Sequence, residues 1–159
     1  MNLLISVIGG STCTEDEARM AEAVGAELAA RGATVVCGGL TGVMEAACRG
    51  ARRAGGHTIA LLPGDDPRAA NPDIEFAIPT GLGHARNVLV ARAGRAVIAV
   101  AGSYGTLSEL SLALVYGIPV VALHTWDVSL HGMPPKGIYR ADNPVDAVDQ
   151  ALALANARD

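Results

Sequence analysis

The feature of this sequence that most constrains its fold is a set of short apolar runs, each of which ends at a glycine-rich turn and precedes a segment with helical spacing. Runs of this kind occupy residues 3–8, 34–37 and 96–100. Continuous apolar runs of this length are typical of strands buried on both faces of a parallel sheet. Their alternation with helices of roughly ten residues implies right-handed crossovers. The sequence therefore predicts an α/β fold: a single Rossmann-like domain over residues 1–159, with a doubly wound, mostly parallel sheet and helices on both faces.

The bounds of the expected elements follow from helix caps and chain breakers. Thr14 stands three residues before Glu17, which is a capping-box pattern, and Gly32 marks the end of the helix that follows. Residues 65–73 are polar, contain two prolines and are expected to form a surface loop. The expected strands are 3–8, 34–37, 57–62, 74–78, 96–100 and 118–123, and the expected helices are 15–31, 43–54, 83–93, 106–116 and 145–155.

Composition and charge argue against several classes of protein. Half of the residues are hydrophobic and the net charge is only −4, so the chain can bury enough apolar surface to fold. Its apolar runs are far shorter than the roughly 18 residues of a membrane span. Residues 1–8 lack the basic start of a signal peptide, which favours a cytoplasmic protein with no membrane partner. A pI near 5.5 argues against a nucleic-acid partner.

The spacing of cysteines and histidines predicts no metal site. The three cysteines show no C-x-x-C or other ligand spacing and are expected to be small buried hydrophobes. His57, His124 and His131 do not pair with one another or with carboxylates at ligand spacing, and they are expected at the surface.

Three glycine-rich turns follow expected strands and are the candidate ligand site. Glycine lets the backbone approach a ligand closely, and the free N–H groups at a helix start attract anions. The turns are therefore predicted to converge on a phosphate-bearing ligand, although such turns also occur simply to pack a helix against a strand. Neither a dinucleotide-binding GxGxxG nor a Walker motif is present, which disfavours a dehydrogenase or an NTPase. The candidate residues in the turns are Gly9, Gly10, Ser11, Gly38, Gly39, Gly42, Gly102, Ser103, Gly105 and Thr106.

Two of these turns resemble motifs of a known family. Residues 102–109 read Gly-Ser-Tyr-Gly-Thr-Leu-Ser-Glu and resemble the PGGxGTxxE motif of the LOG family of cytokinin-activating phosphoribohydrolases. Residues 38–44 are similar to that family's GGGxxGLM loop, and Arg86 lies where the family carries an arginine. Ala101 and Ser103 stand in place of the motif's proline and second glycine, so Ser103 narrows the approach that a glycine would allow.

Within this superfamily the chain most resembles a bacterial subgroup related to molybdenum cofactor carrier proteins. The resemblance to the LOG family covers about residues 5–123. The shared patterns are GGxxGVMEAAxxGA at residues 38–51, LLPG at 61–64 and TGxGxARN at 80–87.

The resemblance also implies roles for single residues. Met44, Thr80 and Asn87 would join the ligand-binding residues, and Arg86 and Glu109 match the pair that is essential in the hydrolases. Such a pair would cleave the N-glycosidic bond of a nucleoside 5′-monophosphate, with the carboxylate beside the ribose and the arginine holding charge on the substrate. From its position at the start of a helix alone, Glu109 has a second interpretation, as a cap for neighbouring amide groups.

Two functions follow from the resemblance. The first is a binding or carrier protein for a phosphorylated heterocycle, with the molybdenum cofactor or a nucleoside monophosphate as the bound molecule. The second is a phosphoribohydrolase that requires no cofactor. Likeness to the carrier subgroup favours the first, and relatives of both kinds imply a homodimer or homotetramer.

Two further points concern the end of the chain. A pyridoxal-phosphate decarboxylase, a label often given to this superfamily, is rejected because the single lysine, Lys136, lies outside every glycine-rich turn. Residues 124–136 contain the single tryptophan, Trp126, and either contact the ring of a ligand or form a surface crossover.

Overall fold

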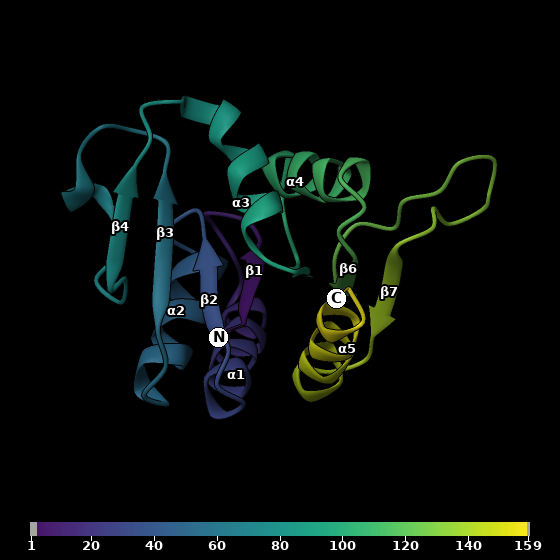
Figure 1. The fold of residues 1–159 in the computed structure, drawn as a ribbon, viewed down its shortest axis with the longest axis horizontal. Coiled ribbons are helices and arrows are strands. Elements are labelled where there is room, and N and C mark those ends of the chain that lie inside the picture. The colour runs from purple at the N-terminus through teal and green to yellow at the C-terminus, as the bar shows by residue number, and fades with distance from the viewer. Residues whose placement is uncertain (1–2, 159) are drawn as a thin grey trace.

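A computed structural model of the chain describes residues 3–158, which form one parallel β-sheet with helices on both faces (Figure 1). The strands are β1 (Leu4–Ile8), β2 (Thr34–Cys37), β3 (Thr58–Leu62), β4 (Phe76–Pro79), β5 (Ala96–Val100), β6 (Val120–Leu123) and β7 (Ile138–Ala141). Their order across the sheet is β4-β3-β2-β1-β5-β6-β7, and every neighbouring pair is parallel. The predicted α/β fold is therefore confirmed.

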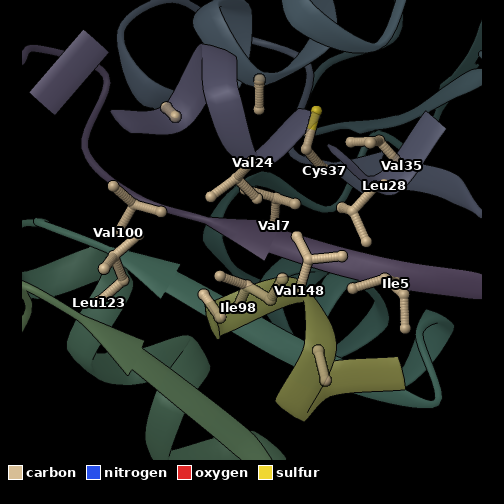
Figure 2. Close-up of a cluster of buried hydrophobic side chains, with 14 of the residues drawn as sticks. Ile5, Val7, Val24, Leu28, Val35, Cys37, Ile98, Val100, Leu123 and Val148 are labelled. Atoms are coloured by element: carbon tan, nitrogen blue, oxygen red, sulfur yellow. The ribbon is translucent and has the colours of Figure 1, made fainter. Parts of the chain in front are cut away.

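The helices divide between the two faces of the sheet. The first layer contains α1 (Glu15–Ala30), α2 (Val43–Arg53) and α5 (Pro144–Asn156), and the second contains α3 (Asn87–Ala93) and α4 (Tyr104–Val115). In β5, Ile98 and Val100 pack with the first layer, whereas Val97 and Ala99 pack with the second. This division arises because successive side chains of a strand point to opposite faces. Figure 2 shows the first of these clusters, which includes Val24 of α1.

Small residues allow α1 and α2 to pack at backbone contact. A Cβ atom at Gly25 of α1 would lie 1.9 Å from the carbonyl oxygen of Ala47. A Cβ atom at Gly50 of α2 would lie 1.9 Å from the carbonyl oxygen of Glu22. The backbone of each helix therefore fills the space that a side chain would need on the other.

The structure differs from the sequence prediction at several elements. It adds β7, an edge strand in which only Ala141 is fully buried, so β7 lacks the apolar run that marks the central strands. The expected helix 83–93 is divided into a 3-10 turn, Gly83–Arg86, and the shorter α3. The helix expected from residue 106 begins at Tyr104, because the Thr106 hydroxyl accepts a 3.1 Å hydrogen bond from the N–H of Ser103 at the helix start. The expected loop 65–73 includes a second 3-10 turn, Pro67–Ala69.

The prediction for the cysteines is wrong at one position. Cys37 and Cys48 are buried, but Cys13 is partly exposed because it lies in the turn before the N-cap of α1. Within residues 3–158 the structure has no helix that combines the length and the hydropathy needed to cross a bilayer.

The topology brings the glycine-rich turns to one place. β2, β1 and β5 are neighbours, and the direction in which the chain adds strands reverses between β1 and β5. The carboxyl ends of parallel strands share one edge, and ligands of open α/β sheets bind at such a reversal. The turns after β1, β2 and β5 therefore meet at the position where a ligand site is expected.

Candidate functional site

A cleft of about 170 Å³ lies at this edge, between the turns that follow β1, β2 and β5 and the 3-10 turn before α3. The structure brings residues from distant parts of the sequence together here. Those among the predicted site residues that line the cleft are Gly9, Ser11, Met44, Arg86, Asn87, Ser103, Gly105, Thr106 and Glu109.

Hydrogen bonds join the turns after β1 and β2. The Thr41 hydroxyl donates to the carbonyl oxygen of Ser11 at 2.8 Å, and the N–H of Val43 donates to that of Gly10 at 3.0 Å. Gly42 has a φ of 68°, and a Cβ atom there would lie 2.4 Å from the same Gly10 oxygen. Val43 at the start of α2 therefore spends its N–H inside the protein.

Other predicted residues support the cleft without lining it. A Cβ atom at Gly38 would lie 2.5 Å from Nη1 of Arg86, so Gly38 makes room for the guanidinium. The Thr80 hydroxyl donates to the carbonyl oxygen of Leu62 at 2.7 Å and so holds the end of β3. The remaining members of this group are Gly10, Gly39, Gly42 and Gly102. The ligand-binding role of these four glycines stays a prediction, and so does the alternative that they only pack a helix against a strand.

Arg86 and Glu109 form a buried pair in the cleft. Nη1 of Arg86 lies 3.5 Å from Oε1 of Glu109 and donates a 3.2 Å hydrogen bond to Oδ1 of Asn87. The two charged side chains are only 7% and 9% exposed. Nε of Arg86 is buried and has no hydrogen-bond partner among residues 3–158. The guanidinium is therefore incompletely satisfied by the protein.

Burial decides the charge of this pair. It raises the pKa of Glu109 to about 7, although the neighbouring Arg86 acts in the opposite direction. Burial also lowers the pKa of Arg86, against the effect of Glu109, but a guanidinium starts so high that it stays charged at neutral pH. A carboxyl group that is only partly ionised balances part of this positive charge. The pair therefore leaves the cleft favourable to an anion.

Two residues that line the cleft were not predicted. Leu40 lies within the turn after β2 and adds an apolar surface, and His84 lies in the 3-10 turn two positions before Arg86. Leu40 looked like an ordinary loop residue between glycines, and His84 has no ligand-like spacing. His84 could have been found only by recognising that residues 83–86 form a turn beside the cleft rather than the first turn of a longer helix.

A family model described as the SLOG cluster4 family matches residues 2–148. This chain belongs to the SLOG cluster4 family. The solved structures that it resembles include molybdenum cofactor carrier proteins, so the predicted membership of the superfamily that joins these carriers to LOG-like proteins is confirmed.

The relatives match this SLOG cluster4 chain over nearly its whole length. An uncharacterized protein of Archaeoglobus fulgidus is 42% identical over 152 residues, which cover 94% of each protein. The structure of the molybdenum cofactor binding protein of Rippkaea orientalis is 31% identical with a TM-score of 0.89, over 97% of this chain and 98% of that one. The Moco carrier protein of Chlamydomonas reinhardtii is 31% identical with a TM-score of 0.88, over 99% of each chain.

Proposed function

We propose that this chain is a binding or carrier protein for a phosphorylated heterocyclic ligand, and that the cleft holds the phosphate. The observation that carries the proposal is the buried guanidinium of Arg86. Its facing carboxyl, on Glu109, has a pKa of about 7, and its Nε has no partner among residues 3–158. A buried cation that is balanced only in part is stabilised by an anion. The start of α4, which lines the cleft, adds the positive end of a helix dipole.

The solved relatives support the choice of ligand. Two of them are named as a molybdenum cofactor binding protein and a Moco carrier protein. This cofactor joins a pterin ring system to a phosphate, which is the chemistry of the proposal, and we propose it as the cargo. A nucleoside monophosphate is the alternative of the same class. Molybdenum and pterin fluorescence should copurify with the protein from a host that makes the cofactor, and their complete absence would argue for the nucleotide.

Replacement of Arg86 tests the phosphate site. We expect Arg86→Met to weaken the binding of ribose 5-phosphate about ten-fold or more, because a hydrogen bond to a charged group contributes about 1.5–3 kcal/mol. Isothermal titration calorimetry measures this change. Arg92→Met is the matched control, since Arg92 lies on α3 with its guanidinium carbon 4.5 Å from the centre of the Tyr116 ring and does not line the cleft. Equal affinity of the wild type and Arg86→Met would contradict the proposal.

A phosphoribohydrolase is the second candidate, and the Glu109 carboxyl is the observation that favours it. A pKa of about 7 suits a group that both gives and takes a proton near neutral pH. Incubation with AMP or isopentenyl-AMP, followed by an assay for ribose 5-phosphate, separates the two functions. Turnover that disappears in Glu109→Gln would establish the hydrolase, whereas nucleotide that remains intact favours the carrier.

A further inference from the structure

The cleft is too small to enclose the whole of the proposed ligand. Its volume of about 170 Å³ lies below the roughly 300–1,000 Å³ of sites that surround a small organic molecule. A phosphate with part of a sugar or linker fills such a space. The heterocyclic ring therefore needs a second surface close to the cleft.

A second cavity, of about 290 Å³, is lined in part by the turn after β5. Gly102 lines this cavity, and the next residue, Ser103, lines the cleft, so the two spaces meet the same turn at consecutive residues. Nε1 of Trp126 donates a 3.0 Å hydrogen bond to the carbonyl oxygen of Ser103. This hydrogen bond holds the indole against the turn after β5. The other residues that line the second cavity are Glu17, Ala101, His124 and Thr125.

The surface at this turn is aromatic, in a chain that has few aromatic residues. The rings of Trp126 and Tyr104 lie with their centroids 5.8 Å apart and their planes at 34°. Tyr104 is 82% exposed, although a large aromatic side chain usually buries most of its area. Phe, Trp and Tyr together make up 3% of the chain, so the pair beside the cleft does not reflect a generally aromatic surface. Exposed aromatic rings stack with flat heterocyclic rings, and this stacking depends little on which heterocycle is bound.

Glu17 gives the second cavity a hydrogen-bond preference. Its Oε2 accepts the N–H of Thr14 at 2.8 Å in the capping box of α1, which fixes the carboxylate where it lines the cavity. No lysine or arginine lies among the described residues that line this cavity. An ionised carboxylate only accepts hydrogen bonds. The Glu17 carboxylate can therefore accept hydrogen bonds from a ring edge with two adjacent N–H donors. A ring nitrogen that is itself an acceptor would be repelled by the carboxylate oxygens.

We propose that the cavity lined by Trp126 and Glu17 binds the ring of the ligand whose phosphate occupies the cleft. Trp126 stacks with the ring, and Glu17 selects a ring with a 2-amino-4-oxopyrimidine edge, as in guanine and pterins, over an adenine ring. This assignment rests on the proposed function, because the phosphate in the cleft is what brings the ring to the cavity.

The single tryptophan makes the test direct, since all indole fluorescence comes from Trp126. The wild-type protein is titrated with GMP, AMP and ribose 5-phosphate, and the affinities are measured in parallel by calorimetry. We expect GMP to quench Trp126 and to bind about ten-fold tighter than ribose 5-phosphate, which lacks a ring to stack. We expect AMP to bind about ten-fold more weakly than GMP, because its ring offers the carboxylate an acceptor. Chromatography after the titration checks that the nucleotides are intact.

Variants separate the two contributions. Glu17→Gln keeps the capping box, because glutamine caps at the same position, but it removes the carboxylate and should abolish the preference for GMP over AMP. Glu15→Gln, in the same helical turn and outside the cavity, is the matched control and should keep the preference. Trp126→Leu should weaken the binding of GMP, because the ring loses its stacking surface while Glu17 still contacts its edge.

Each outcome bears on a separate part of the assignment. Equal binding of GMP and ribose 5-phosphate, with no response of Trp126, would overturn the ring site and leave the phosphate site standing. Quenching by both nucleotides at equal affinity would overturn the selection by Glu17. Failure of all three compounds to bind would instead overturn the proposed function.

Discussion

The buried position of Glu109 in the fold changes how easily its carboxyl group ionises. A glutamate beside an arginine usually ionises more easily than in water. Here the carboxyl group is 9% exposed, and burial nevertheless raises its pKa to about 7. Loss of hydration outweighs an ion pair at 3.5 Å, as is common for buried pairs.

This shift predicts a pH dependence of stability. The ordinary pKa of 4.5 applies in the unfolded chain, so between about 4.5 and 7 the folded protein binds more protons. The free energy of unfolding should therefore fall as the pH rises through this window, by about 3 kcal/mol at most. Urea unfolding at pH 5 and pH 8 measures the fall, which Glu109→Gln should reduce and Glu15→Gln, at an exposed position, should not. The same pH dependence in the wild type and Glu109→Gln would disprove this account.

Single residues also show where sequence reasoning succeeds. Arg86 and Glu109 are predicted because they occupy fixed places in two family motifs, and the structure brings them within 3.5 Å. Thr80 belongs to the same motif as Arg86, but its hydroxyl donates to the carbonyl oxygen of Leu62 and does not line the cleft. A motif predicts which residues gather, whereas the direction of each side chain depends on hydrogen bonds that only the folded chain defines.

Among the elements, α1 and α2 depend on two glycines for their contact. We expect Gly25→Ala to lower the free energy of unfolding by about 1–3 kcal/mol or more, because its methyl group would be forced against the backbone of Ala47. Gly105→Ala is the matched control: it too lies in a helix, but the nearest atom to its Cβ would be 3.8 Å away. It should be neutral or gain up to about 1 kcal/mol from helix propensity. Thermal unfolding compares the variants, and an unchanged Gly25→Ala would refute the close contact.

The elements differ in how well the sequence predicts them. β1, β2 and β5 are buried on both faces and are mostly apolar runs, so their positions were predicted to within one residue. The edge strands are harder to predict from the sequence, because each has solvent in place of one neighbouring strand and need not be apolar throughout. In β4, Phe76 is 55% exposed and Ile78 is 47% exposed, and β7 contains Tyr139 and Arg140 in its centre. Neither edge strand has the pattern of a buried strand, and β7 was missed altogether.

For the whole molecule, we expect assembly into a homodimer or homotetramer. The exposed apolar side chains on and next to α3 and α4 include Val115 at 77%, Tyr116 at 44% and Leu89 at 38%. Light scattering should give a multiple of 16.2 kDa, and Val115→Glu should lower the mass. Val145→Glu, at an exposed position on α5 in the other layer, should not change it. A 16 kDa particle at micromolar concentration would contradict this expectation.

The link between the turns after β1 and β2 affects how a cargo would be handed over. Separating these two turns would break both the Thr41 and the Val43 hydrogen bonds, so the two turns should move as one rigid unit. The cleft is also lined by Ser103 in the turn after β5, whose carbonyl oxygen accepts the hydrogen bond of the Trp126 indole. The proposed carrier function therefore predicts that displacing Trp126 loosens the site at the turn after β5 only, while the linked turns after β1 and β2 stay in place.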